Sequence, residues 1–341
     1  MIRILLTSCS AGLKRYEALF FTKISKYKNE IKVYGCDNKA GKSSYYEDFF
    51  QVPMGDEENY IEEIIHIVRK NLIDFIIPSS DEEAISLSKH KNTLKQHNCI
   101  PLCSDYDVLN LINDKAKTYD LCQKNSIPVA KFKLCKNKKD IYHNILEFNK
   151  EYEEFVLKPN NDRGGRGVYI ISKKIKEKKL IGRELQITPN EIINNYDEFF
   201  IDDNEYIIME KLYPPCHDVD ILCDNGKLID LIVRKRLNSE LPNEGHEIIN
   251  ETKNLKNIKE ICKIFKLNFL HDIDFMIDEY GNFKLIEINP RISGSTIISS
   301  VLGYKIFDNL IALAQNQYNF EMSSNLGIIL PEDLESFYRK I

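Results

Sequence analysis

Two neighbouring β-strands joined by a tight turn are predicted for residues 272–291, and this hairpin constrains the fold more than any other segment. The turn chemistry comes from Glu279-Tyr280-Gly281-Asn282. The strand content is apolar and comes from Phe275, Ile277, Phe283, Leu285, Ile286 and Ile288. The pattern is that of a β-hairpin.

The polar residues of this hairpin carry hard oxygen ligands. Asp274 is expected to face Glu287 and Asn289 across the two strands. Carboxylate and amide oxygens suit Mg²⁺, which is usually shared with substrate phosphates, and Arg291 could neutralise a terminal phosphate. The pattern predicts a nucleotide site. The alternative is an ordinary hairpin with surface acids, so other parts of the chain must decide.

A second strand pair is predicted upstream, around a glycine-containing turn. Phe155-Val156-Leu157-Lys158 reads as a strand, and a returning strand starts near Val168. The turn between them contains Gly164, Gly165 and Gly167, which allow backbone N–H groups to approach phosphate oxygens, while Lys158 supplies a positive charge. No Gly-Lys-Ser/Thr ends the turn, so it is not a Walker loop. The alternative is a mobile hairpin tip.

Taken together, Glu287-Ile288-Asn289-Pro290-Arg291, Lys158 and the glycine turn resemble the ATP-grasp superfamily. Within it, the chain is most similar to single-module proteins that resemble one half of the carbamoyl-phosphate synthase large subunit, a group that includes ATP-dependent carboxylate–amine ligases. The likeness runs from residue 1 to about residue 315. It is specific for the fold and for ATP, but not for the substrate.

The resemblance implies an α/β chain with a Rossmann-like pre-ATP-grasp domain, followed by the α+β ATP-grasp fold. The expected boundaries are 1–112 for the first domain and 113–315 for the second, with a lid subdomain at about 130–205, and 316–341 as a helical tail. Ile2–Leu6, Ile31–Tyr34 and Phe75–Ile77 read as buried strands of a parallel sheet. The turn after the first of them is not a G-x-G-x-x-G, so no dinucleotide site is predicted there.

The resemblance also assigns the ATP site. It gives the phosphates to Lys115, Lys158, Gly164, Gly165 and Gly167, the adenine to Glu210, Lys211 and Leu212, the ribose to Asp218, and Mg²⁺, or alternatively Mn²⁺, to Asp274, Glu287 and Asn289. An exposed strand acid is the alternative interpretation of Asp218.

The acceptor side is predicted on the strand that ends in Arg234-Lys235-Arg236. Strand alternation places Arg234 and Arg236 on one face and Lys235 on the other. We expect Arg291, with Arg234 or Arg236, to act catalytically on the γ-phosphate and the acceptor. His217 is interpreted as a surface residue, and residues 237–250 match no substrate signature.

The composition narrows the class of protein. The net charge is −5, which gives no overall basic signal for nucleic acid, and the nine cysteines include no Cys-x-x-Cys pair, so buried thiols are expected instead of disulfides or zinc. No apolar run approaches the ~20 residues of a membrane span. The expected location is therefore cytoplasmic, with neither nucleic acid nor membrane as a partner.

The mechanism that the resemblance implies has two steps: a carboxylate is activated on Mg-ATP as an acyl phosphate, and an amine or amino acid then displaces the phosphate. Two alternatives stay open. One is a carbamoyl-phosphate-synthase-like half that phosphorylates bicarbonate or carbamate, with ammonia from a glutaminase partner as an open question. The other is an ATP-binding subunit without turnover. Family members are often dimers, so a homodimer is also an open alternative.

Overall fold

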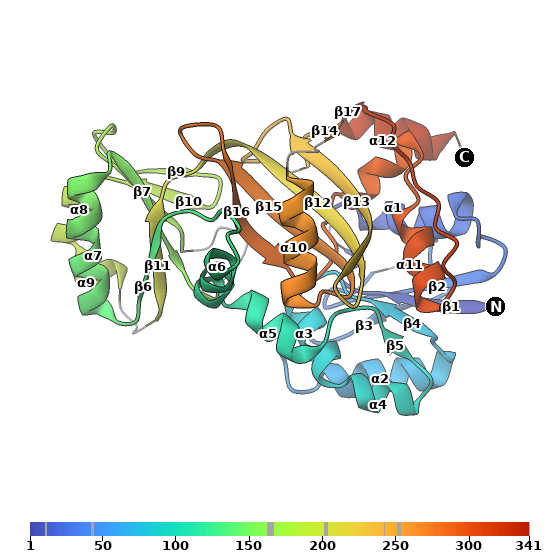
Figure 1. Cartoon of the computed structure of the whole chain (residues 1–341). Helices are drawn as coiled ribbons and strands as arrows, with labels where there is room; N and C mark the ends of the chain where they lie inside the picture. The colour runs from blue at the N-terminus through green and yellow to red at the C-terminus, as the bar shows by residue number, and fades with distance from the viewer. Residues whose placement is uncertain are drawn as a thin grey trace.

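The structure is a computed structural model that describes residues 1–341 except 11, 42–43, 162–166, 201–203, 242, 251–253 and 341. It contains three sheets, which follow one another along the chain; in Figure 1 the third sheet lies between the second, on the left, and the first, at the lower right. The fold is mixed α/β, as predicted.

The first sheet is parallel throughout and has the strand order β3-β2-β1-β4-β5. The three predicted strands are confirmed. Its strands are β1 (Ile2–Leu6), β2 (Ile31–Asp37), β3 (Phe49–Gln51), β4 (Phe75–Ile77) and β5 (Ile100–Pro101). Its helices are α1 (Lys14–Leu19), the π-helix η1 (Phe20–Ile24), α2 (Tyr60–Asn71), α3 (Asp81–Lys89) and α4 (Lys91–Gln96).

Two helices, α5 (Tyr106–Asn113) and α6 (Lys115–Lys124), connect the first sheet to the second. The Asp114 side chain caps α6 by accepting a hydrogen bond from the Lys117 amide. The second sheet has the order β6-β11-β7-β8-β10-β9 and carries helices on its outer side (Figure 1). Its elements are β6 (Phe132–Cys135), α7 (Lys138–Glu151), β7 (Glu154–Pro159), β8 (Tyr169–Ser172), β9 (Lys179–Ile181), β10 (Glu184–Ile187), α8 (Pro189–Asn194), α9 (Tyr196–Phe199) and β11 (Tyr206–Glu210).

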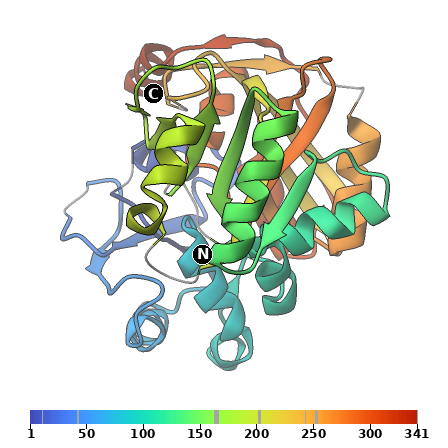
Figure 2. The same ribbon diagram turned by 90° about the vertical axis from the view of Figure 1, so that its left-hand side faces the viewer.

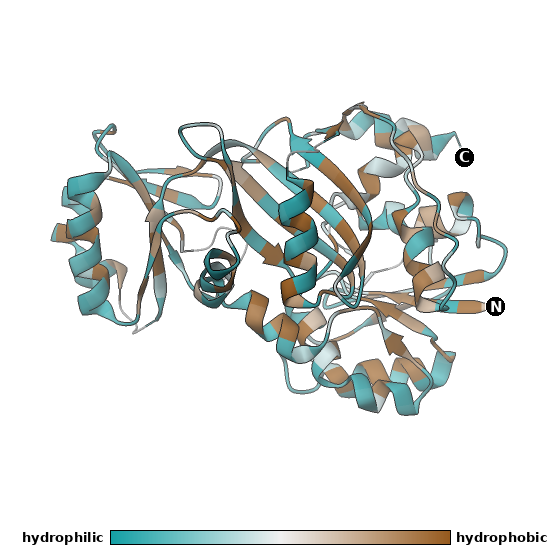
Figure 3. Cartoon of the chain, in the orientation of Figure 1, coloured by the Kyte–Doolittle hydropathy of each residue, from teal (hydrophilic) through white to brown (hydrophobic). Residues whose placement is uncertain are grey.

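Figure 2 views the molecule from the side of this second sheet, with its helices toward the reader. The outer surfaces of α7 and α8 are largely hydrophilic (Figure 3). Ile141, Ile145 and Phe148 of α7 are buried instead, and they pack in one cluster with Phe155 and Leu157 of β7. The second sheet therefore has its own apolar core.

The third sheet carries the predicted hairpin and has the order β16-β15-β12-β13-β14-β17. Helix α10 covers one face of this sheet, and η2 and α11 cover the other. The two groups of helices pack in different apolar clusters, and alternate residues of β12 belong to each cluster. The elements are β12 (Tyr213–Asp224), β13 (Lys227–Arg236), β14 (His246–Ile249), α10 (Leu255–Phe265), β15 (Phe269–Ile277), β16 (Phe283–Asn289), the 3₁₀-helix η2 (Thr296–Leu302), α11 (Ile306–Ala314), β17 (Gly327–Ile329) and α12 (Pro331–Arg339).

The expectation that residues 316–341 form only a helical tail was wrong. The predicted closing helix is present as α12, but β17 before it pairs with β14 and completes the third sheet. Leu334 and Tyr338 of α12 are buried in the largest apolar cluster. The segment therefore belongs structurally to the third sheet.

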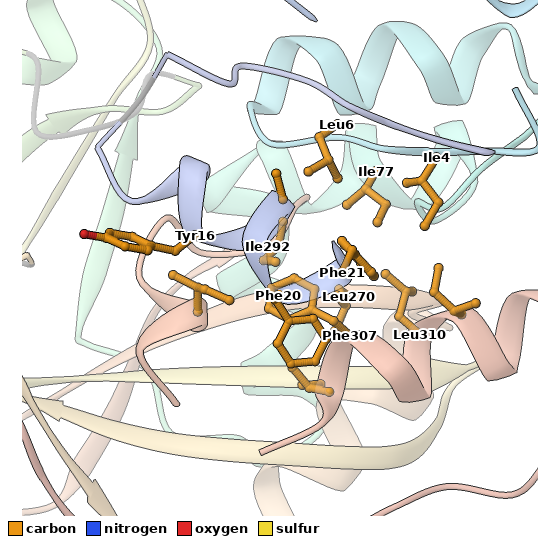
Figure 4. Close-up of a cluster of buried hydrophobic side chains, with 14 of the residues drawn as sticks. Ile4, Leu6, Tyr16, Phe20, Phe21, Ile77, Leu270, Ile292, Phe307 and Leu310 are labelled. Atoms are coloured by element: carbon orange, nitrogen blue, oxygen red, sulfur yellow. The ribbon is translucent and has the colours of Figure 1, made fainter. Parts of the chain in front are cut away.

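One continuous apolar cluster joins the first sheet to the third (Figure 4). Ile4, Leu6 and Ile77 of the first sheet lie above Phe20 and Phe21, which follow α1. The same cluster contains Leu270 of β15, Phe307 and Leu310 of α11, and Ile292 of the connection between β16 and η2. Because protein interiors are close-packed, this shared core fixes the position of the first sheet relative to the third.

Within the described residues, no single helix is long and apolar enough to cross a membrane. The bent pair η2 and α11 passes the same test only when the two helices are taken together, and most of their side chains are buried in the protein.

Candidate active site

A row of four charged residues crosses four adjacent strands of the third sheet. Asp218 on β12 is directly opposite Arg234 on β13 and Asp274 on β15, and Asp274 is in turn opposite Glu287 on β16. Side chains in such a row share one face and lie close together. The predicted hairpin, with Asp274 facing Glu287, is confirmed. Asn289 faces Asp272 instead, one pair further along the same face.

The hairpin contains a β-bulge beside the row. Asp274 pairs with Glu287 but Phe275 pairs with Leu285, so Ile286 is an extra residue on β16. Bulges bend a strand and re-aim side chains, and they are frequent next to active sites. This bulge lies directly before Glu287 in β16.

The oxygen atoms of the hairpin fit a hard divalent cation. The Asn289 amide nitrogen donates to Asp272 Oδ2 at 3.2 Å, which leaves the Asn289 amide oxygen available as a ligand. Asp272 Oδ1 is buried and has no hydrogen-bond partner among the described residues. Burial, together with the Asp218 and Asp220 charges, raises the pKa of Asp272 to about 8. Burial and the Asp272 charge also raise the pKa of Asp274 well above its usual value. A bound divalent cation would offset this repulsion between carboxylates.

Two lysines from outside the third sheet reach Glu287. Lys115 Nζ, at the start of α6, lies 3.9 Å from Glu287 Oε2. Burial opposes ionisation of Glu287, but Lys115 and Lys158, with Arg291 and Arg236, hold the pKa of Glu287 below its usual value. Burial lowers the pKa of the Lys158 ammonium, because the residue is only 8% exposed. The structure therefore brings both predicted phosphate lysines to the metal-ligand candidates.

Buried Asn160 holds the two lysine-bearing segments together. Its side-chain oxygen accepts from the Ala116 amide at 2.9 Å, and its Nδ2 donates to Asp114 Oδ1 at 3.1 Å. The start of α6 is thus fastened to the chain that leaves β7, and these two segments carry Lys115 and Lys158. The sequence analysis did not identify this residue.

Arg236 is held in the row by Asp218. Arg236 Nε and Nη2 donate to the two Asp218 oxygens at 3.0 and 2.5 Å, and Nη2 is also 3.5 Å from Asp274 Oδ1. Asp218 is fully buried, and Arg234 and Arg236 hold its pKa below the usual range against the effect of burial. Its carboxylate is therefore occupied as a counter-ion, which contradicts both the ribose contact and the exposed acid that we considered for it.

Arg234 is also placed differently from the prediction. The expected alternation is confirmed, since Arg234 and Arg236 both contact Asp218 while Lys235 pairs with Glu247. However, Arg234 is 0% exposed, and it donates to Asp220 through Nε at 2.6 Å and Nη2 at 3.1 Å. Its Nη1 donates to Ser295 Oγ at 2.7 Å. All three guanidinium nitrogens are bonded inside the protein, so Arg234 does not face the acceptor; Arg236 and Arg291 remain as candidates.

Arg291 connects the hairpin to the first sheet. Its Nε donates to Asp81 Oδ1 at 3.0 Å, and Asp81 begins α3 directly after Ser80, which caps that helix. Arg291 Nη1 lies 3.7 Å from Asp272 Oδ2. The end of the first sheet that carries α3 thus faces the polar end of the third sheet.

The remaining predicted residues have mixed outcomes. Glu210 ends β11, and its carboxylate accepts a hydrogen bond from the Lys131 amide. Lys211 Nζ donates to Glu154, and Leu212 is buried. The adenine role of these three residues stays a prediction. Gly164 and Gly165 lie outside the described residues. Gly167 has φ +64°, a backbone conformation that favours glycine.

The interpretation of His217 as a surface residue was wrong: it is buried, with the centroid of its ring 4.7 Å from that of Phe283. The nine cysteines are all buried and free, as expected.

A buried hydrogen-bond chain behind the hairpin was missed. His271 Nδ1 lies 2.9 Å from the Asn289 carbonyl oxygen, and His271 Nε2 lies 2.7 Å from Ser104 Oγ. Since a carbonyl only accepts, Nδ1 carries the proton and Ser104 donates to Nε2. The chain fixes the backbone of Asn289. Strand alternation could not have predicted this chain, because Ser104 is not on a strand of the third sheet but in the connection before α5.

This chain predicts an acid-sensitive contribution to stability. Burial lowers the pKa of His271 to about 4. Below about pH 6.5 the unfolded chain binds a proton at this histidine, whereas the folded chain binds it only below about pH 4. The free energy of unfolding therefore falls by up to ~3 kcal/mol as the pH drops from 6.5 to 4. In urea unfolding across this range, His271→Gln is expected to lose less stability on acidification than the wild-type chain. His143→Gln, at an exposed histidine, is the control; equal losses in wild type and His271→Gln would contradict the prediction.

Family models match three consecutive parts of the chain. A PylC-like N-terminal domain model matches residues 4–102, a sugar-transfer associated ATP-grasp model matches residues 94–198, and a model for the ATP-grasp in the biosynthetic pathway with the Ter operon matches residues 202–328. No curated protein matches the chain in sequence at a significant level.

Solved structures match nearly the whole chain at low identity. The biotin carboxylase domain of Hydrogenobacter thermophilus 2-oxoglutarate carboxylase, in complex with MgADP, ADP and bicarbonate, has a TM-score of 0.68 at 15% identity, over 94% of this chain and 71% of that one. N5-carboxyaminoimidazole synthetase from Staphylococcus aureus with ADP has 0.65 at 15%, over 97% and 80%. L-amino acid ligase from Bacillus licheniformis has 0.64 at 13%, over 94% and 74%. At such identities the likeness concerns the fold.

Proposed function

Because the chain belongs to the ATP-grasp superfamily, we propose that it is an ATP-dependent ligase that joins a small carboxylate to an amine or amino acid. The observation that carries the proposal is the charged row of the third sheet, to which Lys115 and Lys158 are added from outside that sheet. This grouping of cations and hard oxygen ligands suits phosphoryl transfer, which needs positioning and charge stabilisation more than covalent chemistry.

In this proposal, Asp274, Glu287 and Asn289 hold Mg²⁺. When bound, Mg²⁺ would neutralise charge on the β- and γ-phosphates. Lys115 and Lys158 contact phosphate oxygens. The adenine lies against residues 210–212, after β11.

The acceptor carboxylate is assigned to Arg236 and Arg291. Both guanidinium groups are held by an acid behind them, Asp218 and Asp81 respectively, while their side chains remain 17% and 22% exposed. Asp218 holds Nε and Nη2 of Arg236, and Arg291 is held through Nε by Asp81 and through Nη1 by the Ile292 carbonyl oxygen. A guanidinium that is fixed in this way can present its remaining N–H groups to a carboxylate without losing further side-chain entropy. Such a pair would orient the acceptor in line with the γ-phosphate.

The proposed reaction has two displacements. A carboxylate oxygen attacks the γ-phosphorus, the bond from that phosphorus to the β,γ-bridging oxygen breaks, and ADP leaves. The amine nitrogen then attacks the acyl carbon, the bond from that carbon to the phosphate oxygen breaks, and phosphate leaves as the nitrogen loses a proton. Arg236 and Arg291 would stabilise the charge that builds up in both steps.

A second candidate is ATP-dependent phosphorylation of bicarbonate. One structure of similar fold is a biotin carboxylase domain in complex with bicarbonate, and another is an N5-carboxyaminoimidazole synthetase. Bicarbonate would use the same two arginines. The third alternative is a non-catalytic ATP-binding subunit. Such a subunit would not need the charges of the cations and acids in the row to compensate one another as closely as phosphoryl transfer requires.

The test is ADP and phosphate release from Mg-ATP across a matrix of carboxylates, bicarbonate and amines, with mass spectrometry of the products and Glu287→Ala as the blank. Release that requires both a carboxylate and an amine, with a condensed product, is the expected result. Release that requires bicarbonate would favour the second candidate. Tight ATP binding without release under any condition would overturn both in favour of the non-catalytic subunit.

A further inference from the structure

Tyr119 lies where three parts of the site meet. It is on α6, one helical turn after Lys115, and its side chain is fully buried against Phe132, with 5.1 Å between the ring centroids. Its hydroxyl accepts a hydrogen bond from Lys158 Nζ on β7 at 3.1 Å and donates to the Ile286 carbonyl on β16 at 2.5 Å. A single oxygen therefore connects the helix that carries one phosphate lysine, the strand that carries the other, and the hairpin.

The direction of this hydrogen-bond chain is determined by its ends. A lysine ammonium can only donate and a carbonyl can only accept, so the Tyr119 hydroxyl must accept from Lys158 and donate to Ile286. Among the described residues, this hydroxyl is the hydrogen-bond acceptor of Lys158 Nζ. The ammonium also lies 5.4 Å from the centroid of the tyrosine ring. A lysine has a long, flexible side chain, so a fixed acceptor at its tip restricts where its charge can lie.

The other end of the chain is the bulge. Ile286 is the extra residue of β16, and Glu287 follows it directly. β16 is also an edge strand of the third sheet, where the Leu285 amide donates to the Pro128 carbonyl of the segment after α6. The Tyr119 hydroxyl thus holds the backbone immediately before the candidate metal ligand. The hydrogen bond from Tyr119 to Ile286 also fastens this edge of the third sheet to α6, which leads into the second sheet.

We propose that Tyr119 is a positioning residue that sets Lys158 and the Glu287 bulge at a fixed separation, and so prepares the site for the β- and γ-phosphates of ATP. The inference rests on the proposed phosphate role of Lys158. It assigns no contact with ATP to Tyr119 itself. Loss of the hydroxyl alone would free Lys158 and leave the Ile286 carbonyl without its partner, while the ring would keep its packing.

The test is Tyr119→Phe, with the dissociation constants of Mg-ATP, Mg-ADP and AMP measured by calorimetry on the full chain. Since a hydrogen bond to a charged group changes binding by about tenfold or more, ATP and ADP are expected to bind about tenfold more weakly, with AMP unchanged. Tyr338→Phe is the matched control, because the buried hydroxyl of Tyr338, in the closing helix α12, bonds Ser300 of η2 at 3.0 Å, outside the candidate site. It is expected to leave all three constants unchanged.

A double-mutant cycle with Lys158→Met separates positioning from general loosening. If Tyr119 acts through Lys158, Tyr119→Phe should have little further effect on ATP binding once the ammonium is gone. Equal weakening of ATP and AMP, or full additivity in the cycle, would overturn the inference. Because binding is measured without turnover, a chain that binds ATP in this pattern but ligates nothing would disprove the proposed ligase and still support Tyr119. A wild-type chain that does not bind ATP would disprove both.

Discussion

Glu287→Gln is expected to lower ATP turnover by about a thousandfold or more. The substitution keeps the size of the side chain but removes a carboxylate that lies opposite Asp274 and within 3.9 Å of Lys115. In the proposed function this carboxylate holds Mg²⁺, and loss of charge stabilisation at a transferring phosphoryl group costs several kcal/mol of the barrier. Turnover is measured as ADP release under the substrate conditions that give a condensed product with the wild-type chain.

Glu279→Gln is the matched control for this experiment. It makes the same chemical change in the same hairpin, but Glu279 lies in the exposed turn between β15 and β16. We expect wild-type turnover from this control, and far-UV circular dichroism like that of wild type from both variants. If Glu287→Gln turned over ATP at the wild-type rate, the metal assignment would be wrong. A residual rate that rises with added Mg²⁺ would support it further.

The parts of the fold that depend on local patterns could be predicted from the sequence. The hairpin of β15 and β16 was identified from apolar residues and a Gly281 turn, and the structure gives Gly281 a φ of +79°, which requires such a residue. The three strands predicted for the first sheet were apolar runs long enough for a buried parallel sheet. β17 was missed because a three-residue strand carries almost no periodic signal and forms only by pairing with β14.

For the site, strand alternation predicted the face of a side chain but not its depth. Arg234 and Arg236 share a face, as expected, yet Arg234 lies one pair further in, where Ser295 before η2 covers it. Asp218 likewise follows the alternation and was assigned a ligand, although two arginines already neutralise it. The same period of two would have identified Asp220 and Asp272 as members of the polar face.

Positioning residues were harder to find, because their partners are distant in the chain. Tyr119 bonds Ile286 and Ser104 bonds His271, and each pair is 167 residues apart. Tyr119 had one local signal, since it follows Lys115 by four residues and so shares its face of α6. Ser104 had none. Such contacts exist only once the three sheets are packed together.

Arg234→Met is expected to destabilise the protein by about 3–5 kcal/mol. The substitution removes a fully buried cation and leaves the carboxylate of Asp220 without its two guanidinium donors, and an uncompensated buried charge costs about that much. This is a large part of the ~5–15 kcal/mol that holds a typical domain folded. The measurement is the midpoint of urea unfolding. Lys235→Met, on the same strand but at a half-exposed ion pair with Glu247, is the control and should change stability by less than ~1 kcal/mol.

A second substitution distinguishes a structural Arg234 from a catalytic one. If the loss in Arg234→Met comes from the stranded carboxylate, adding Asp220→Asn should recover part of the stability, because the buried charge is then removed together with its partner. A catalytic Arg234 predicts the reverse pattern: unfolding at the wild-type urea concentration, loss of ATP turnover, and no recovery from Asp220→Asn. That outcome would restore the assignment made from the sequence, and it would mean that the guanidinium leaves Asp220 when substrate binds.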